Sequence, residues 1–292
     1  ISAAEDKTAY TKSGLDLLTA RRQLEETRLK MTSEANLSLL KKGISIVLMT
    51  RNEEINLEAC LKSCSFADEI ILIDDGSTDN TLSIAEKFGA KIFHRALNGD
   101  WAAQQNFGIA QASEYWVMLM DADERITPDL ASKLKQAAEG EDVAYLVQRH
   151  NKFKNISVTH GALRPDWVCR FAPRTKIEIF GQVHPEIRVG CPKKRLQSEG
   201  LIHYPYRTWK QYINKLNLYS DLAADRYLSE QKSVYFLRDV VGRPLWSFFK
   251  IYFLNRGFLD GKAGFIFSVN NAVYTMNKYA KYYFLKHYSG EL

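Results

Sequence analysis

Hydrophobic and polar positions follow two alternating periods from Gly43 to about residue 120. Short apolar runs rich in β-branched residues predict four strands, at residues 44–49, 69–73, 91–93 and 115–120. Between them, apolar positions at helical spacing predict three helices, at residues 53–64, 78–88 and 101–112. Strands that alternate with helices of about 10–15 residues favour βαβ units. The pattern therefore predicts an α/β fold around a mostly parallel sheet.

The pattern differs on either side of this α/β segment. Residues 1–42 are polar and amphipathic without a strand signal, which predicts an N-terminal helical extension. Beyond residue 206 the spacing predicts three more helices, at residues 209–230, 234–255 and 265–288. The expected organisation is an extension at 1–42, an α/β domain at 43–206 and a C-terminal amphipathic helical region at 207–292.

The last two predicted helices combine aromatic residues with an excess of Lys and Arg. Aromatic side chains at helical spacing usually fill a core, but only Asp239 and Asp260 oppose these cations before Glu291. The excess favours helices that lie on anionic lipid, in a protein that is cytoplasmic and peripheral on the inner face of the cell membrane. No uncharged apolar run reaches the roughly 18–20 residues of a membrane span, so an integral membrane protein is not expected.

Composition narrows the class of protein further. With 46% hydrophobic and 25% charged residues, the 292-residue chain has globular rather than disordered or collagen-like proportions. The net charge of +6 suits an anionic partner such as a nucleotide, a nucleic acid or an acidic lipid, without choosing among them. The four cysteines form no CxxC pair or zinc framework, which favours reduced, structural thiols in the cytosol.

The triplet Asp121-Ala122-Asp123 directly follows the fourth predicted strand. Two carboxylates one residue apart can point into one space, and their oxygens suit Mg²⁺ or Mn²⁺ that also binds substrate phosphate. The alternative is a pair of loop carboxylates before the next helix, where Thr127 is the expected N-cap and Pro128 the first helical residue. Ligands bind beyond the carboxyl ends of parallel strands, so the position favours metal binding.

A second polar cluster, residues 74–79, follows the second predicted strand. Ser77 or Thr78 is expected to cap the next helix, and Gly76 allows a tight turn. Capping does not require both Asp74 and Asp75 at the end of the strand. A carboxylate there can also accept a hydrogen bond from a uracil N–H or a ribose hydroxyl, so a structural and a binding role both stay open.

Four motifs, in this order, resemble those of family 2 glycosyltransferases with the GT-A fold. They are Val47–Glu54, Ile73–Thr81, Gln104–Phe107 and Leu119–Glu124. Later segments resemble the branch of that family with the lipopolysaccharide inner-core β-glucosyltransferases. They are His160-Gly161, Arg164–Trp167, Arg170-Phe171, Gln182–His184, His203-Tyr204 and Gly257–Gly261. The resemblance extends from about residue 43 to 288.

The resemblance implies a site for a UDP-sugar at the carboxyl ends of the strands. The residues that it places around the nucleotide sugar are Thr50, Arg51, Glu53, Asp74, Asp75, Gln104, Asn106, Asp121, Ala122 and Asp123. The first three would line the uridine pocket. The divalent metal, Mg²⁺ or Mn²⁺, would lie at Asp121, Asp123 and His184, where it neutralises charge on the leaving UDP.

The family inverts the anomeric carbon, which requires a carboxylate that takes the proton of the acceptor hydroxyl. Glu186 follows His184 in a position that resembles the His-Glu pair of the family, although Pro185 intervenes where the acid often stands. Asp166, in the Pro-Asp segment, is the second candidate. Both stay open.

The expected function is transfer of a hexose, glucose first, from a UDP-sugar to a glycan, most simply the lipopolysaccharide core, without a nucleic-acid partner. One alternative is a transferase that acts on a capsule, another lipid-linked glycan or a protein. A second is a nucleotidyltransferase, which would release pyrophosphate instead of UDP. A third is a membrane-surface or nucleic-acid scaffold, which would have no use for Asp121 and Asp123.

Overall fold

The computed structural model describes residues 42–153, 156–181 and 185–288. The predicted N-terminal helical extension therefore lies outside the described residues, apart from Lys42. The strands are β1 Ile44–Thr50, β2 Glu69–Asp74, β3 Lys91–His94, β4 Trp116–Asp121, β5 Glu124–Ile126, β6 Ala144–Phe153, β7 Ile156–Ser157, β8 Asp166–Pro173, β9 Ile177–Phe180, β10 Glu186–Val189, β11 Lys193–Arg195 and β12 Leu201–Tyr206. The α-helices are α2 Glu54–Ser63, α3 Thr81–Lys87, α4 Trp101–Gln111, α5 Pro128–Ala138, α6 Trp209–Ser229, α7 Arg243–Phe249 and α8 Gly261–His287.

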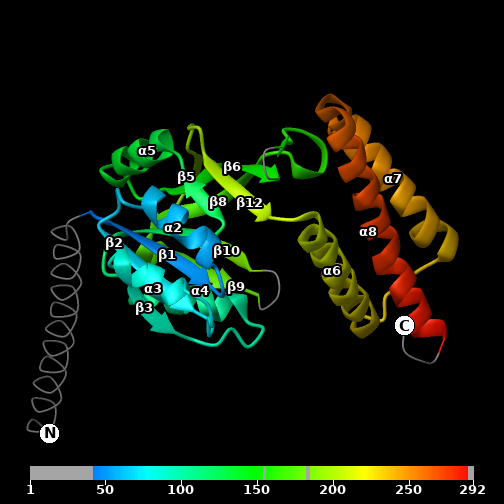
Figure 1. The fold of residues 1–292 in the computed structure, drawn as a ribbon, viewed down its shortest axis with the longest axis horizontal. Coiled ribbons are helices and arrows are strands. Elements are labelled where there is room, and N and C mark those ends of the chain that lie inside the picture. The colour runs from blue at the N-terminus through cyan, green and yellow to red at the C-terminus, as the bar shows by residue number, and fades with distance from the viewer. Residues whose placement is uncertain (1–41, 154–155, 182–184, 289–292) are drawn as a thin grey trace, which may run out of the picture.

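The main sheet has the strand order β3-β2-β1-β4-β8-β6-β12-β5 (Figure 1). Strands β3, β2, β1 and β4 are parallel, and β8 is antiparallel to both β4 and β6. Strand β12 returns parallel to β6, and the short β5 pairs with it in the antiparallel sense. The prediction of an α/β domain with a mostly parallel central sheet and a C-terminal helical region is confirmed.

Successive residues of the parallel strands alternate between two cores, as they must in a sheet covered on both faces. On one face Ile46, Leu48 and Leu72 pack with α2, α3 and α5. On the other face Val47 and Ile71 pack with α4 and with the two-stranded ribbon of β9 and β10. This double cover leaves the strand ends as the places where polar side chains can gather.

The amino end of strand β2 is fastened by one buried carboxylate. Glu69 accepts hydrogen bonds from the Ser45 hydroxyl, the Lys91 ammonium at 2.5 Å and the Ser113 backbone N–H at 2.9 Å. Burial raises the pKa of Glu69, but the bonds from Lys91 and the two serines more than offset this and bring it to about 2. This edge is therefore structural, and the candidate chemistry lies at the opposite edge.

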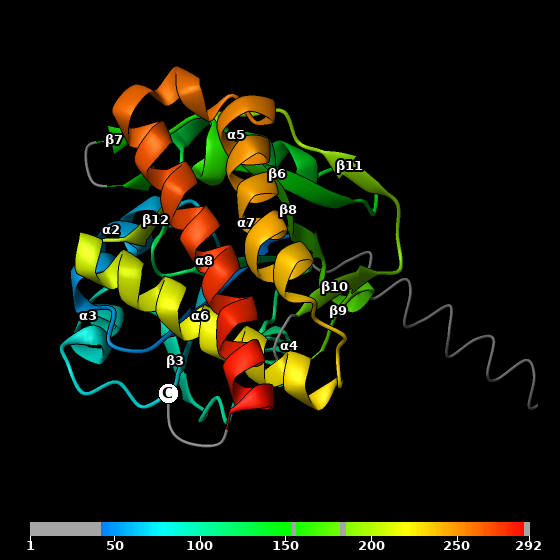
Figure 2. The ribbon, with the colours of Figure 1, turned by 90° about the vertical axis from the view of Figure 1, so that its right-hand side faces the viewer.

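The C-terminal helices form a separate layer beside the sheet. Helix α6 begins three residues after β12 ends, and α8 packs against both α6 and α7 (Figure 2). Phe153, Tyr212 and Phe267 form a small core that joins the sheet to α6 and α8. No helix among the described residues is long and apolar enough to cross a membrane.

The segment around α7 departs from regular α-helix. The turns on either side of it are π-helical, η3 at Phe236–Gly242 and η4 at Lys250–Leu254. A 3₁₀ turn, η5 at Gly257–Asp260, follows and leads into α8. The predicted helix at 234–255 is therefore present as three consecutive helical pieces.

Two predicted helix starts are wrong. The second predicted helix begins at Thr81 rather than Thr78, because Ser77 and Thr78 are engaged by the preceding loop instead of by the helix. Ser77 and Thr78 are therefore not its cap, which is Asn80. Helix α8 begins at Gly261, four residues before the predicted start.

Candidate active site

The carboxyl ends of three neighbouring strands bring the candidate residues together. In the sheet register Thr50 of β1 lies beside Asp74 of β2, and Met49 lies beside Asp121 of β4. Two inter-strand spacings therefore separate the end of β2 from that of β4, or about 10 Å. A nucleoside diphosphate can bridge such a span, with β1 beneath its middle.

The loops after β1 and β2, residues 50–54 and 74–81, are bonded to each other along their whole length. Asn52, in the left-handed region with φ 55°, donates its N–H to the Ser77 hydroxyl and accepts from the Thr78 N–H. Further bonds join these loops from the backbone N–H groups of Glu53, Glu54, Asp75 and Asn80. The two loops therefore form one rigid edge of the site, to which Arg51 adds an ion pair with Asp75 at 2.9 Å.

Asp74 is buried at the end of β2 and is only half satisfied. Its Oδ2 accepts hydrogen bonds from the backbone N–H groups of Gly76 and Ser77, both at 3.0 Å. Its Oδ1 has no hydrogen-bond partner in the part of the chain that the structure describes. Asp75 instead accepts from the Leu97 backbone N–H at 2.7 Å. The free acceptor at this strand end is therefore on Asp74.

Gln104 and Asn106 both lie in α4, but they differ in what they can bind. The Gln104 amide donates to the Arg95 carbonyl at 2.9 Å, while its buried Oε1 has no partner among the described residues. Asn106 donates to the Ile179 carbonyl at 2.7 Å and accepts from the Ile179 N–H at 2.9 Å. Asn106 thus fastens β9 to α4, whereas Gln104 offers an acceptor.

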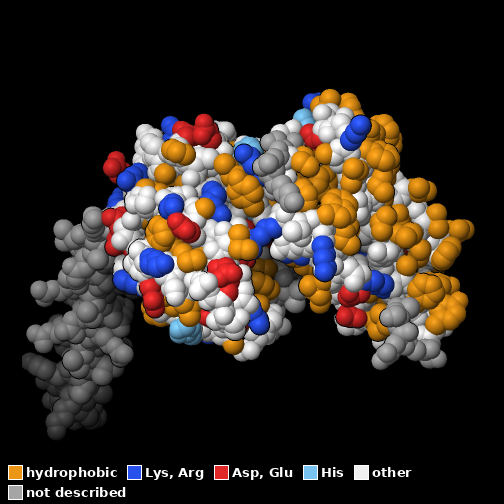
Figure 3. Space-filling model, in the orientation of Figure 1, with side chains coloured by type: hydrophobic (Ala, Val, Ile, Leu, Met, Phe, Trp, Pro, Cys, Tyr) orange, Lys and Arg blue, Asp and Glu red, His pale blue; other side chains and the backbone are white. Residues whose placement is uncertain are grey.

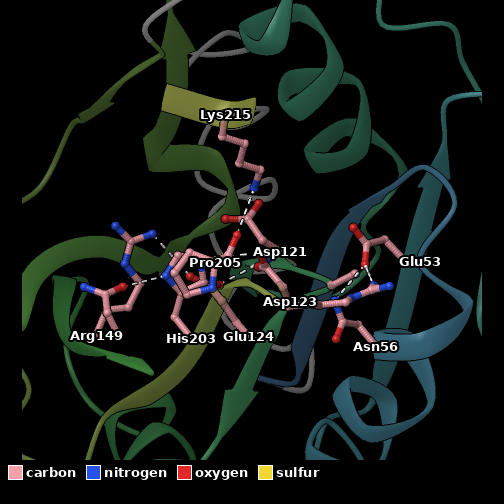
Figure 4. A network of polar contacts seen from close by, with 12 residues as sticks. Glu53, Asn56, Asp121, Asp123, Glu124, Arg149, His203, Pro205 and Lys215 are labelled. Carbon is pink, nitrogen blue, oxygen red and sulfur yellow. Dashed lines mark hydrogen bonds and ion pairs between the residues drawn. The ribbon is translucent and has the colours of Figure 1, made fainter. Parts of the chain in front are cut away.

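The end of β4 carries a cluster of carboxylates, those of Asp121, Asp123 and Glu124, which Figure 4 shows gathered near Arg149 and His203. Arg170, on β8, donates to Asp121 at 2.7 Å and to Glu124 at 3.2 Å. Arg149, on β6, reaches Glu124 at 3.5 Å from the other side. Asp121 is therefore held by Arg170, and the buried Glu124 is shared between the two arginines.

The charges in this cluster shift one another's pKa values in opposite directions. Burial raises the pKa of Asp121, but the Arg170 charge outweighs it, so the pKa lies below its usual value. Burial dominates at Glu124 and, with the charge of Asp121, raises its pKa despite Arg170. For Arg170, burial lowers the pKa, but the two carboxylates outweigh it and raise the pKa. The guanidinium therefore stays charged, and Asp121 stays ionised beside it.

Asp123 is the member of the triplet with a buried oxygen that lacks a partner among the described residues, and its side chain lies beside His203 (Figure 4). Its Oδ2 lies 3.5 Å from His203 Nε2, and His203 in turn contacts Asn151 Oδ1 at 2.7 Å through Nδ1. Its Oδ1 is buried and has no partner among the described residues. Ala122, between the two aspartates, is buried, and its carbonyl accepts from Arg125 at 2.9 Å.

Another side of the site is formed by residues just before α2 and by residues just before and within α6. Glu53 pairs with Arg207 at 2.9 Å and accepts from the Asn56 amide at 2.9 Å. Burial raises the pKa of Glu53, and the Asn56 bond and the Arg207 charge offset this only in part. The Lys215 ammonium donates to the Pro205 carbonyl at 3.1 Å (Figure 4). Cationic groups from the C-terminal region thus reach the edge of the site.

The two candidates for the catalytic base lie in different parts of the fold. Asp166 begins β8, beyond the carboxyl end of β4, and its carboxylate is held by Arg149 through two bonds of 2.8 and 3.1 Å. Glu186 begins β10 in the separate ribbon, is 71% exposed and lies 3.6 Å from Arg188. The structure therefore joins Asp166, and not Glu186, to the carboxylate cluster. His184 lies outside the described residues.

A divalent metal fits this site only with help from a substrate. Among the described residues, no three His, Cys, Asp or Glu side chains are arranged to hold a metal ion. Mg²⁺ is commonly bound by one or two carboxylates, with substrate phosphates and water completing its shell. The unpartnered Oδ1 of Asp123 suits this arrangement, and Asp121, whose Oδ2 is engaged by Arg170, keeps its Oδ1 for a second bond.

Comparison with known proteins identifies the class of enzyme. The model of the family described as glycosyl transferase family 2 matches residues 45–203, which is more than half of the chain and includes all the strand ends described above. The chain therefore belongs to glycosyltransferase family 2, and the predicted family is confirmed.

Individual relatives match most of the chain. It is 29% identical over 256 residues to the lipopolysaccharide core biosynthesis glycosyltransferase LpsC of Rhizobium meliloti, covering 83% of this chain and 93% of LpsC. It is 28% identical over 257 residues to the uncharacterized glycosyltransferase RC0292 of Rickettsia conorii, covering 80% and 87%.

Solved structures resemble the chain more distantly. A glucosyl-3-phosphoglycerate synthase from Mycobacterium tuberculosis matches 62% of this chain and 79% of its own at 17% identity, with a TM-score of 0.40. Residues 1–349 of TarS from S. aureus match 86% of this chain and 93% of their own at 13% identity, with a TM-score of 0.39.

Sequence reasoning missed part of this constellation. Arg149 is not among the residues that the sequence singles out, and Glu124 and His203 appear there only within motifs. Arg170, which the sequence analysis names only within a motif, pairs with Asp121 and Glu124. A signal was present, because Arg149 and Arg170 both lie in half-buried strands, where an unpaired charge is rarely tolerated.

Proposed function

We propose that the chain transfers a hexose, glucose first, from a UDP-sugar to a glycan acceptor with inversion of the anomeric carbon. A single observation supports a binding site for the sugar donor at one edge of the sheet. Three buried acceptor oxygens without a partner among the described residues, on Asp74, Gln104 and Asp123, belong to the edge where β2, β1 and β4 end. Because buried polar atoms are almost always hydrogen-bonded, these oxygens imply a polar ligand.

The positions of the three oxygens support a nucleoside diphosphate with a divalent metal. Asp74 and Gln104 lie on the β2 side, where they suit N–H and hydroxyl donors of a nucleoside. Asp123 lies on the β4 side and would hold Mg²⁺ or Mn²⁺. When bound, that ion would neutralise the negative charge that develops on the leaving diphosphate. Arg170 holds Asp121 ionised nearby, so the region stays attractive to a cation.

For the base we propose Asp166 rather than Glu186. The Arg149 guanidinium orients the Asp166 carboxylate with two bonds, at the edge where the donor would lie. There it can accept the proton of an acceptor hydroxyl as that oxygen attacks the sugar. The similarity to LpsC, which is named for lipopolysaccharide core biosynthesis, supports a core oligosaccharide as acceptor.

The donor site is tested by UDP release from a panel of UDP-sugars, because slow hydrolysis of a donor needs no acceptor. We expect release from one sugar in Mn²⁺ or Mg²⁺, none in EDTA, and a loss of at least about 100-fold in Asp123→Asn. Glu139→Gln, an exposed carboxylate at the end of α5, is the matched control and should match wild type. Metal-independent release, or full activity of Asp123→Asn, would overturn the proposal.

The base is tested by the same assay with an acceptor present. Asp166→Asn should lower kcat of transfer by about 10²–10⁴-fold while UDP still binds, since only the proton acceptor is lost. Glu186→Gln should change kcat less than about twofold if Glu186 is not the base. The reverse result would assign the base to Glu186.

A further inference from the structure

An apolar stripe runs along the outer face of residues 236–254. Five of its side chains recur at every fourth position, Leu237, Val241, Leu245, Phe249 and Phe253, and are 41–77% exposed. The other face of this segment is buried, with Val240 and Ile251 against neighbouring helices. The exposed apolar side chains therefore form one continuous row and are not scattered.

The unusual helix geometry keeps this row straight. In an α-helix of 3.6 residues per turn, a row at i, i+4 drifts around the axis in one direction. The turns of η3 and η4 are wider, with i→i+5 bonds, and make the same row drift in the opposite direction. The alternation of π, α and π turns therefore holds the stripe on one side over roughly 24 Å, at about 1.5 Å per residue.

The neighbouring turn and helix extend the apolar area. Phe258, Leu259, Phe265 and Ile266, from η5 and the start of α8, are each about half exposed. Figure 3 shows hydrophobic side chains gathered over this end of the molecule, away from the sheet. Contiguous apolar surface of this kind marks a contact with a protein or a membrane.

The charge of this region identifies its partner. Residues 232–288 contain nine Lys and Arg but only two Asp and no Glu, a charge of +7, whereas the whole chain carries +6. Both aspartates point inward: Asp239 is 1% exposed and pairs with Arg238 and Arg243, and the Asp260 side chain is 5% exposed. Every carboxylate of residues 232–288 is thus buried, while Lys250 and other cations flank the stripe in solvent.

We propose that this surface binds an anionic phospholipid membrane, with the apolar stripe in the interface and the cations on lipid phosphates. Large apolar side chains beside exposed Lys and Arg are the combination that such a membrane selects. A second copy of this chain would bring two surfaces of like charge together. The proposal does not depend on which sugar or acceptor the enzyme uses.

The membrane-binding surface is fastened to the sheet domain. Asp260 accepts hydrogen bonds from the backbone N–H groups of His160 at 2.9 Å and Thr159 at 3.3 Å. The Gly161 N–H donates to the Asn255 carbonyl at 2.9 Å. The bilayer would therefore hold the strand ends at a fixed height and orientation, which suits an acceptor carried by a lipid.

Flotation of the full chain with vesicles tests the proposal. Wild type should float with phosphatidylcholine vesicles that contain phosphatidylglycerol, and about fivefold less with phosphatidylcholine alone or in 0.5 M salt. The variant Leu237→Ser/Leu245→Ser/Phe249→Ser should float about tenfold less, because it loses the apolar row. Ile55→Ser, which removes a 70% exposed apolar side chain on α2, is the matched control and should float like wild type.

A second variant separates the contribution of charge. Lys250→Gln/Arg256→Gln/Lys262→Gln should lose most of the preference for anionic vesicles while its urea unfolding midpoint stays that of wild type. Wild type that fails to float, or a triple serine variant that floats normally, would overturn the proposal. A wild-type dimer that the serine variant abolishes, without vesicle binding by either protein, would instead assign the surface to self-association.

Discussion

Replacing Arg170 by Met tests whether one guanidinium holds the carboxylate cluster together. The variant leaves Asp121 and Glu124 without the partner that lies 2.7 and 3.2 Å from them. Removing one partner of a buried ion pair typically costs about 3–5 kcal/mol, because the other charge stays buried. The Asp121 side chain is 39% exposed, whereas Glu124 is fully buried. We therefore expect Arg170→Met to lower the free energy of unfolding by about 3–4 kcal/mol at pH 7.5, mostly because of Glu124.

The loss should depend on pH in a defined direction. Without Arg170 the pKa of Glu124, already raised by burial, rises further, so folding takes up a proton. A carboxyl group with a raised pKa in the folded state destabilises the protein as pH rises from its unfolded to its folded pKa. The difference between Arg170→Met and wild type should therefore shrink as pH falls from 7.5 to 5.5, by roughly 1 kcal/mol.

Urea unfolding followed by tryptophan fluorescence measures both effects, since the buried Trp116 stacks on Phe171 next to Arg170. Arg188→Met is the matched control, because Arg188 is 59% exposed and its contact with Glu186 spans 3.6 Å. The control should lose less than about 0.5 kcal/mol. A loss below about 1 kcal/mol in Arg170→Met, or an equal loss at both pH values, would refute the reasoning.

Three other variants test interactions that stabilise the sheet domain. Glu69→Gln should lower the free energy of unfolding by about 2 kcal/mol at pH 7. This difference from wild type should vanish as pH falls from 4.5 through about 2, where the wild-type carboxylate becomes protonated, and urea unfolding across this pH range checks it. Gly200→Ala should lower the Tm by several degrees, because φ is 75° and the new Cβ overlaps a carbonyl oxygen, while Gly190→Ala should be neutral. Asn106→Ala should cost about 1–3 kcal/mol by leaving Ile179 unpaired, and a thermal melt in which it matches wild type would contradict this.

The sequence predicts the first half of the fold because each of its elements has a local signal. Strands β1, β2 and β4 are buried on both faces and appear as nearly unbroken apolar runs, so the hydrophobic pattern alone locates them. From β6 onward the strands carry polar residues, such as the half-buried Arg149 and Asn151 and the buried Arg170, which weaken that pattern. Their place in the sheet is decided by partners far along the chain, which local patterns do not encode.

For the candidate site, too, the sequence predicts some features and not others. Asp74 and Asp123 stand at the ends of strands with strong signals, so sequence reasoning places them at one edge. Their unpartnered oxygens depend on which neighbours reach them, and only the folded chain shows that Arg170 engages Asp121 while leaving Asp123 Oδ1 free. The same applies to Asp166, whose link to the cluster passes through Arg149 across two strands.

The bonded loops after β1 and β2 limit how this enzyme can be re-engineered. Residues 50–54 and 74–81 donate hydrogen bonds to each other in both directions, so the conformation of each loop depends on the other. A chimera that imports only one of them from a relative would inherit donors and acceptors with no counterpart. Grafts of these loops should therefore exchange both segments together, as should any recombination library built on this chain.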